Sequence, residues 1–302
     1  MRSVRFPLIA AVFLYFIPEA WTKTSWNNPP KRADPAIRHA TFYSSSLRTD
    51  VGYNICLPPE YNKDGGKRFP VVYYLHGYEG NESSFLEYAK YWKASVSQSG
   101  PMILVLVNGG ETSFFCDSAD GAVPGETLIA KELVAHIDQK YRTDTNAAGR
   151  SLHGYSMGGF GALKLAFKYP GLFGSVVAYG ATLPDAAGFK KHLGKVYTQV
   201  FGNDPKRFAD NDPFVLAERH ADQIRDRVAI NLIVGSKDDF LPRNRALRDK
   251  LEQLKIRPLY REIGGAGHNK DDLYEPAAAQ AFEFSASQFG RSRKKAAPLD
   301  KH

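Results

Sequence analysis

The sequence predicts an α/β fold in which a mostly parallel sheet is flanked by helices. Short continuous apolar runs, typical of strands buried on both faces, alternate along the chain with stretches of helical spacing. Between one such strand and the helix after it lies a glycine-rich turn with a serine at its centre, at residues 149–161. A chain of 302 residues suits one large domain, which we place at residues 37–290.

Composition and charge narrow the class of protein. The chain has 43% hydrophobic and 24% charged residues, which is ordinary for a globular domain. Half of its net charge of +8 lies in residues 291–302, so we expect a basic, disordered tail. The sequence shows neither a basic face nor a recognisable nucleic-acid-binding element, and we therefore expect no nucleic-acid partner. Two cysteines, Cys56 and Cys116, permit at most one intramolecular disulfide, which the sequence leaves open.

The first 20 residues have the pattern of a secretory signal peptide. Arg2 and Arg5 precede an apolar run at residues 6–17, which is shorter than the about 20 residues of a membrane span. Cleavage is expected after Ala20, although Pro18 is unfavourable at its position, so an uncleaved anchor is the alternative. We predict a secreted or periplasmic protein, with no stable membrane partner unless the leader remains attached.

The first half of the domain begins with a proline-rich lead-in at residues 21–36, which we interpret as a linker or a surface arm. Alternating and β-branched residues then predict two antiparallel strands. After them, a buried strand over 69–75 precedes a helix, another buried strand and a second helix. The expected ranges are 37–47 and 51–57 for the antiparallel strands, 84–97 for the first helix, 102–107 for the next strand and 126–141 for the second helix.

The second half continues the sheet after the serine turn. A strand over 173–179 is followed by a long excursion at residues 182–227 with mixed charges and several prolines. Excursions of this length are usually functional or carry their own helices, and we predict a small helical lid over the site. The remaining elements are strands over 228–234 and 258–263 and helices over 243–254 and 273–289.

The serine turn fits the motif G-x-S-x-G at residues 154–158, with Ser156 at its centre. In a nucleophile elbow the serine backbone is strained, and small residues two positions away let strand and helix approach closely. Gly154, Gly158 and Gly159 supply them. Because the bare motif also arises by chance, an ordinary serine is the alternative unless an oxyanion loop lies upstream of it and an acid and then a histidine lie downstream.

The expected oxyanion loop follows the strand at 69–75. In an open α/β sheet, ligands bind beyond the carboxyl ends of the strands, where His76, Gly77 and Tyr78 lie. One oxyanion-hole amide comes from this loop and the other from the residue after the nucleophile. We assign Tyr78 and Met157, both through their backbone N–H groups. The alternative for His76 and Gly77 is an ordinary turn at the end of a strand.

A serine nucleophile needs a base, and the base needs a carboxylate that orients it. His268 follows the last strand in a glycine-rich loop and is the base that we predict. Asp238 stands three residues after Gly235, where the preceding strand ends, and is the predicted acid, with its neighbour Asp239 as the alternative. The order Ser, Asp, His is the one that this fold requires.

A loop at residues 111–121 lies at the same edge of the predicted sheet. Phe114, Phe115 and Asp117, together with His76, either line an acyl or sugar pocket or, for the aromatic rings, pack beneath the loop. The sequence leaves both open. We expect neither a metal site nor a cofactor, because the chain has no H-E-x-x-H motif and Asp117 with Asp120 is too small a cluster.

Residues 37–289 resemble the esterase D-like branch of the α/β-hydrolases. That branch includes S-formylglutathione hydrolases, tributyrin-type esterases, feruloyl and acetylxylan esterases, and mycolyltransferases. The resemblance implies the α/β-hydrolase fold and an oxyanion hole at Tyr78 and Met157. Many relatives place an aromatic residue shortly after the catalytic histidine, whereas N-K-D-D stands here at 269–272. The matching motifs are L-H-G at 75–77, D-S-A-D-G at 117–121, E-L at 132–133, Y-R-T at 141–143, H-G-Y-S-M-G-G at 153–159, G-S-K-D at 235–238 and G-A-G-H at 265–268.

The predicted function is that of a secreted serine carboxylesterase whose acyl-enzyme is resolved by water. The resemblance favours an acyl or aromatic ester, small or linked to a polysaccharide, as in feruloyl and acetylxylan esterases. One alternative is an acyltransferase of the mycolyltransferase type, in which a sugar or lipid hydroxyl replaces water. A non-catalytic carbohydrate-binding protein that retains the fold is the other. The sequence leaves the exact ester and the oligomeric state open.

Overall fold

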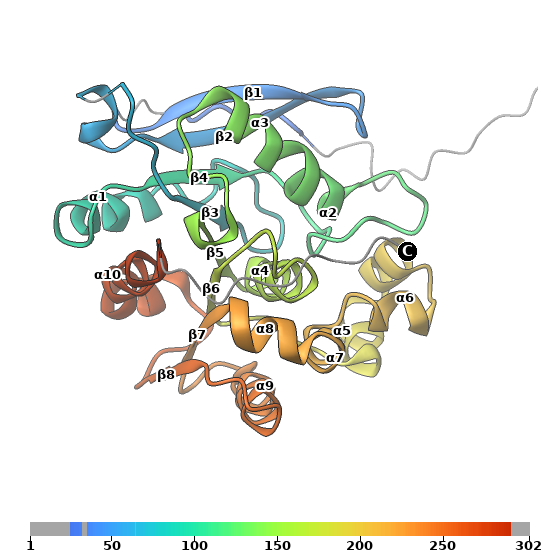
Figure 1. The fold of residues 1–302 in the computed structure, drawn as a ribbon. Coiled ribbons are helices and arrows are strands. Elements are labelled where there is room, and N and C mark those ends of the chain that lie inside the picture. Colours follow the sequence, from blue (N-terminus) through green and yellow to red (C-terminus); the bar gives the residue numbers. More distant parts are fainter. Residues whose placement is uncertain (1–24, 32–34, 64, 291–302) are drawn as a thin grey trace, which may run out of the picture.

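The computed structural model describes residues 25–31, 35–63 and 65–290 (Figure 1). The predicted signal peptide at 1–20 and the predicted basic tail at 291–302 lie outside these residues. Eight strands form one sheet in the order β1-β2-β4-β3-β5-β6-β7-β8. β3 lies between β4 and β5 in the sheet. The strands β3 and β5, which precede the predicted oxyanion loop and the serine turn, are therefore neighbours.

The sheet is antiparallel at one edge and parallel elsewhere. β1 (Arg38–Ser44) and β2 (Thr49–Cys56) pair antiparallel, as predicted, and β2 pairs antiparallel with β4 (Ile103–Val107). All other pairs are parallel. They join β4, in sheet order, to β3 (Val71–Leu75), β5 (Arg150–Tyr155), β6 (Ser175–Tyr179), β7 (Ala229–Gly235) and β8 (Leu259–Ile263). The central strands are almost wholly buried because helices cover both faces, whereas in β8, at the edge, only Ile263 is buried.

Helices lie on both sides of the sheet. α1 (Tyr88–Ser99) and α10 (Lys270–Gln288) pack against each other on one side, and α3 (Val134–Lys140), α4 (Met157–Lys168) and α8 (Ala221–Arg227) lie on the other (Figure 1). The helix predicted over 126–141 is continuous but not uniform. It comprises α2 (Gly125–Thr127), a π-helical turn (Leu128–Leu133) and α3. α9 (Leu241–Gln253) packs against β7, and two short 3-10 turns occur at Pro59–Asn62 and Ala147–Gly149.

The excursion after β6 is helical. It forms α5 (Ala186–Phe201), α6 (Pro205–Ala209), α7 (Pro213–Arg219) and α8 (Ala221–Arg227). α7 packs against α4 and α9, so this second half belongs to the helical layer beside the sheet. The first half contacts the loop after β4, where the Ala119 N–H donates to the Gln199 carbonyl over 3.1 Å. The lid predicted for residues 182–227 stays a prediction.

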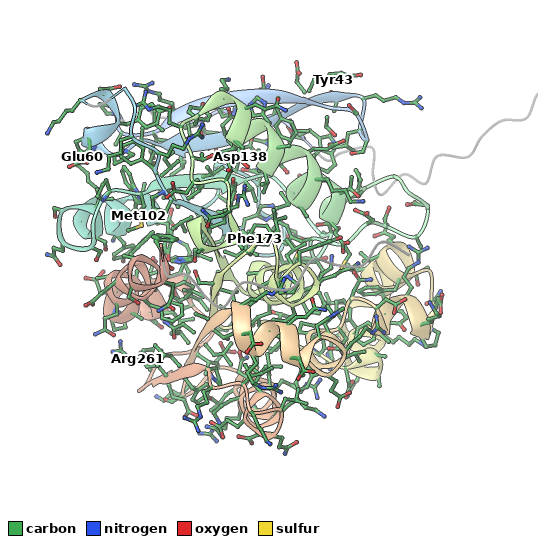
Figure 2. The ribbon with its side chains drawn as sticks, in the orientation of Figure 1. Tyr43, Glu60, Met102, Asp138, Phe173 and Arg261 are labelled. Carbon is green, nitrogen blue, oxygen red and sulfur yellow. The ribbon has the colours of Figure 1, made fainter. Side chains whose placement is uncertain are left out.

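Side chains fill the space between the layers. Figure 2 shows Met102 and Phe173 inside the molecule, both at most 1% exposed, and Tyr43 at its rim, 64% exposed. The sheet separates two apolar clusters, and the two cysteines lie in different ones: Cys56 packs on the α1 and α10 side, Cys116 on the α4 side. The two cysteines therefore form no disulfide with each other. Every helix in the described ranges is too short or too polar to cross a lipid bilayer.

Candidate active site

Ser156 lies in the sharp turn between β5 and α4, with φ +56° and ψ −115°. A positive φ in a residue with a Cβ is strained by about 1–3 kcal/mol and persists only where the surroundings impose it. Here the Ser156 N–H donates to the Tyr179 carbonyl of β6 over 2.9 Å, and the Ser156 carbonyl accepts from the Phe160 N–H over 3.1 Å. The turn therefore has the backbone strain expected of a nucleophile elbow.

Close approach of strand and helix explains the glycines around the serine. A Cβ on Gly154 would lie 2.1 Å from the Gly158 carbonyl oxygen, and a Cβ on Gly158 would lie 2.1 Å from the Leu75 carbonyl oxygen. Both contacts are with backbone atoms, which cannot move aside cheaply. Any larger residue at either position would push β5, β3 and α4 apart and displace Ser156.

His268 and Asp238 meet Ser156 at this turn. His268 Nε2 lies 2.8 Å from Ser156 Oγ, and His268 Nδ1 lies 2.9 Å from Asp238 Oδ2. A carboxylate accepts only, so Nδ1 carries the proton and the lone pair of Nε2 faces the serine hydroxyl. The Asp238 carboxylate is buried and also accepts from the Phe240 N–H over 2.8 Å, whereas Asp239 is exposed. The geometry thus favours Asp238 over its neighbour.

The chain leaving β6 passes directly beside these three residues. Gly180 has φ +49°, and a Cβ there would lie 2.9 Å from Asp238 Oδ2 and 3.3 Å from His268 Nδ1. Two residues later, Thr182 places its Oγ1 3.0 Å from Ser156 Oγ and its N–H 3.1 Å from the Ser156 carbonyl oxygen. Sequence reasoning missed Thr182 because it belongs to no motif and sits at the start of the excursion.

Two aromatic rings hold the His268 imidazole. Tyr155 stacks on it with ring centroids 5.2 Å apart and planes 23° apart, and its hydroxyl donates to the His268 carbonyl over 3.1 Å. Phe240 contacts it edge-on at 4.9 Å. Burial, and secondarily the Asp238 charge, raises the pKa of Tyr155 to about 12, so its hydroxyl stays neutral. These rings supply an aromatic wall from other parts of the chain, since Asn269 instead caps α10 through the Asp271 N–H.

The segments that carry the two predicted oxyanion-hole residues approach each other at the start of α4. Met157 is the first residue of that helix, so its N–H has no acceptor within the helix and lies at the positive end of the helix dipole. The chain entering Tyr78 touches the same turn, because a Cβ on Gly158 would lie 2.6 Å from the His76 carbonyl oxygen. The Tyr78 side chain is 40% exposed, whereas that of Met157 is buried.

His76 lies behind this loop, buried, and not on an open pocket wall as we predicted. Its Nδ1 is 2.8 Å from the Gly77 carbonyl oxygen, and its Nε2 accepts from the Gly109 N–H over 3.3 Å. Burial lowers the pKa of His76 to about 4, which keeps the ring neutral. The neutral imidazole thus ties the loop after β3 to the loop after β4.

The loop at 111–121 also departs from the pocket prediction. Phe114 and Phe115 are buried beneath it, the first against Phe160 and Phe189 and the second against His76. Burial of two apolar rings stabilises the loop more than exposure in a polar cleft, so the second of our two alternatives holds.

Asp117 has a structural role at the same loop. Its Oδ1 accepts from the N–H groups of Glu126 and Thr127 over 2.9 Å each, and its Oδ2 accepts from the Thr127 hydroxyl. These bonds satisfy donors in the first turn of α2, which would otherwise be unpaired. The carboxylate is therefore engaged by the helix, and its place in a substrate pocket stays a prediction.

A buried ion cluster supports this loop from below. Lys164 Nζ donates to the Phe115 carbonyl over 2.6 Å and lies 2.5 Å from Glu126 Oε2. Burial alone would raise the pKa of Glu126, but Lys164 and Lys168 outweigh it and lower that pKa to about 2. The loop is fixed by charge-assisted bonds. Across the described ranges, His, Cys, Asp and Glu side chains form no group of three that would hold a metal ion.

Comparison with known proteins shows the family to which this chain belongs. The family model described as "Putative esterase" matches residues 44–280. The chain belongs to this esterase family. It is 32% identical over 172 residues to an esterase of Mycobacterium tuberculosis, a match that covers 55% of this chain but only 37% of the relative.

Two further similarities span most of the chain. An acetyl esterase of Caldicellulosiruptor saccharolyticus is 26% identical over 264 residues, covering 82% of this chain and 97% of the relative. A solved ferulic acid esterase superposes with a TM-score of 0.72 at 21% identity, covering 84% of this chain and 98% of that one. The second similarity shows that this family member has the α/β-hydrolase fold, as predicted.

Proposed function

We propose that this member of the esterase family is an exported serine carboxylesterase. The observation that carries the proposal is the hydrogen-bonded path from Asp238 through His268 to Ser156, formed at a strained elbow from three separate strand ends. A serine hydroxyl reacts at neutral pH only with a base in reach, and this path supplies one. Export rests on the leader-like pattern of residues 1–20.

In the first half-reaction, Ser156 Oγ attacks the ester carbonyl while His268 Nε2 takes its proton. The buried Asp238 carboxylate holds the imidazole in the required tautomer and stabilises the imidazolium. The N–H groups of Tyr78 and Met157 donate to the oxyanion of the tetrahedral intermediate. His268 then gives its proton to the departing alcohol, which leaves an acyl ester on Ser156.

In the second half-reaction, water replaces the alcohol. His268 takes a proton from that water as it attacks the acyl carbonyl, and returns the proton to Ser156 Oγ when the intermediate collapses. Thr182 Oγ1 lies 3.0 Å from Ser156 Oγ, so its hydroxyl also reaches the leaving oxygen at this step. The cycle needs no cofactor.

The substrate that we propose is an acyl or aromatic ester, small or attached to a polysaccharide. Support comes from the names of two similar proteins, an acetyl esterase and a ferulic acid esterase. The Tyr78 ring, 40% exposed beside the oxyanion loop, offers an aromatic surface on which a substrate ring can stack.

The test is hydrolysis of p-nitrophenyl acetate, methyl ferulate and acetylated xylan by the purified protein and by Ser156→Ala. We expect the variant to lose all but a trace of the activity, and Ser97→Ala, an exposed serine on α1, to keep it. Hydrolysis by Ser156→Ala at the rate of the unchanged protein would exclude the mechanism. An added alcohol acceptor separates hydrolysis from acyl transfer, because transfer gives a new ester.

Localisation needs its own experiment. The full chain and a chain that begins at residue 21 are expressed in a bacterial host, and the esterase activity of the periplasm, medium and cytoplasm is compared. Export predicts that only the full chain delivers activity outside the cytoplasm. Equal distribution of the two chains would contradict a signal peptide.

A further inference from the structure

A buried carboxylate that the mechanism does not use lies at the far end of the oxyanion loop. Glu82 is 1% exposed, and its side chain is fully buried. Burying a charge is costly unless hydrogen bonds replace the lost water. The partners of this carboxylate therefore indicate what the site is built to hold together.

Its donors come from two distant parts of the chain. Oε1 accepts from the Asn28 backbone N–H over 2.5 Å, and Oε2 accepts from Asn28 Nδ2 over 3.1 Å and from Asn108 Nδ2 over 2.8 Å. His39 Nε2 lies 3.5 Å from Oε1. One carboxylate thus joins the lead-in to the end of β4, beside the strand β1.

The lead-in residues 25–28 are tied to the body by further bonds. The Gly52 N–H donates to the Trp26 carbonyl over 2.6 Å, and Ser83 Oγ donates to the Asn28 carbonyl over 2.5 Å. Asn108 Nδ2 also donates to the Ser25 carbonyl over 3.1 Å. Of the two predicted alternatives, this part of the lead-in is an arm packed on the surface.

Glu82 also connects the two loops that position Tyr78. Its own loop runs from His76 through Tyr78 to Glu82, and Asn108 begins the loop after β4. In that second loop the Glu111 carbonyl accepts from the Glu79 N–H, one residue after Tyr78, over 2.7 Å. A shift of the Glu82 carboxylate therefore moves both supports of the Tyr78 amide.

We propose that Glu82 is a positioning residue for the oxyanion hole, and that Asn28 of the arm supplies built-in donors that hold it. Without them the carboxylate would turn toward water and draw the end of its loop outward. The Tyr78 N–H would then point away from the oxyanion, although Ser156 and His268 stay in place. The inference rests on the proposed function, because it concerns the same transition state.

The experiment compares Asn28→Ala with Asn27→Ala in the full-length protein. Asn28 donates from its side chain to Glu82, whereas Asn27 is its exposed neighbour. Misplacement of a stabilising group by a fraction of an ångström lowers the rate steeply. We expect Asn28→Ala to lower kcat about 10-fold with KM changed less than about twofold, and Asn27→Ala to change neither.

The inhibition constant of butylboronic acid is a second measurement, and a loss of stability alone does not change it. Its adduct with Ser156 places an oxygen in the oxyanion hole, so the inhibition constant should rise by the same factor as kcat falls. Asn28→Asp should be worse than Asn28→Ala, because it sets a second carboxylate against Glu82.

A second variant reaches Glu82 from β2. A Cβ on Gly52 would lie 2.2 Å from Glu82 Oε1 and 2.9 Å from His39 Nε2, so Gly52→Ala displaces the carboxylate while every side chain of the arm and the loop is kept. It should reproduce the same fall in kcat and the same weakening of the boronate. Lower melting temperatures with unchanged kcat and inhibition in both variants would overturn the inference. An active Ser156→Ala protein would instead overturn the proposed function.

Discussion

The two halves of the candidate site are held in different ways. In the triad half, Ser156, His268 and Asp238 are fixed by backbone close to their own motifs and by the rings of Tyr155 and Phe240. The oxyanion half depends on hydrogen bonds between loops far apart in the sequence. These bonds run through His76, Gly109, Glu79, Glu111 and Glu82, and reach the arm at residues 25–28.

This difference separates two kinds of damage. A change in the triad half removes a reacting group or its immediate partner, so its effect is large and local. A change in the oxyanion half leaves every reacting group present but moves an amide that acts only in the transition state. It should therefore lower kcat at nearly constant KM, even from a residue that never touches the substrate.

The largest expected effect lies in the triad half and also decides between the two candidate acids. Asp238→Asn should lower kcat by about 10⁴-fold, because an amide does not hold His268 in the required tautomer. Asp239→Asn should stay within about twofold, since that side chain is exposed. Steady-state hydrolysis of p-nitrophenyl acetate measures both. Loss of activity in the second variant alone would show that the acid is Asp239.

The next effect tests the oxyanion half through pH. The pKa of His76 is about 4 in the folded chain, below the ordinary 6.5, because the ring is buried. As pH falls from about 6.5 to 4, the unfolded chain binds the proton first, so folding stability present at neutral pH is progressively lost. The shift corresponds to about 3 kcal/mol.

Urea unfolding at pH 7.5 and pH 4 measures this loss. His153, whose pKa burial lowers to about 3, contributes in the same direction and is present in both proteins compared. His76→Asn should therefore lose about 3 kcal/mol less between the two pH values than the unchanged chain. His192→Asn, at an exposed position on α5, serves as the control. Equal losses for all three proteins would mean that His76 is not held neutral.

The contrast between the two halves of the site also explains which features could be predicted from the sequence. The positions of the strands along the chain, the elbow and the chain order of Ser156, Asp238 and His268 follow from apolar runs and short motifs, which are local signals. The sequence pattern also assigns Tyr78 and Met157 to the oxyanion hole by position, and this assignment stays a prediction. Each of these residues is defined by where a strand ends, and strand ends are visible in a single sequence.

The supports of the oxyanion half carry no such signal. Phe114 and Phe115 were equally consistent with a pocket or with the core, because a ring in a loop shows no periodicity. The partners of Glu82 lie 26 and 54 positions away, and their meeting depends on how the loops fold onto β2 and β4. Long-range hydrogen bonds between polar loop residues leave no periodic pattern that would predict them.

The smallest expected effect is the change in kcat when Tyr155 is substituted. This substitution tests whether packing alone positions the triad half. Tyr155→Leu removes the ring stacked on His268 and the bond from its hydroxyl to the His268 carbonyl, whereas Tyr155→Phe removes only the bond. A stacked aromatic face also attracts the imidazolium that forms during catalysis, by about 1 kcal/mol. We therefore expect kcat to fall about 10-fold in the leucine variant and about twofold in the phenylalanine variant.

Tyr43→Leu, exposed on β1, is the matched control. Equal falls in the two Tyr155 variants would assign the effect to the hydroxyl, and the triad half would then depend on hydrogen bonds as the oxyanion half does.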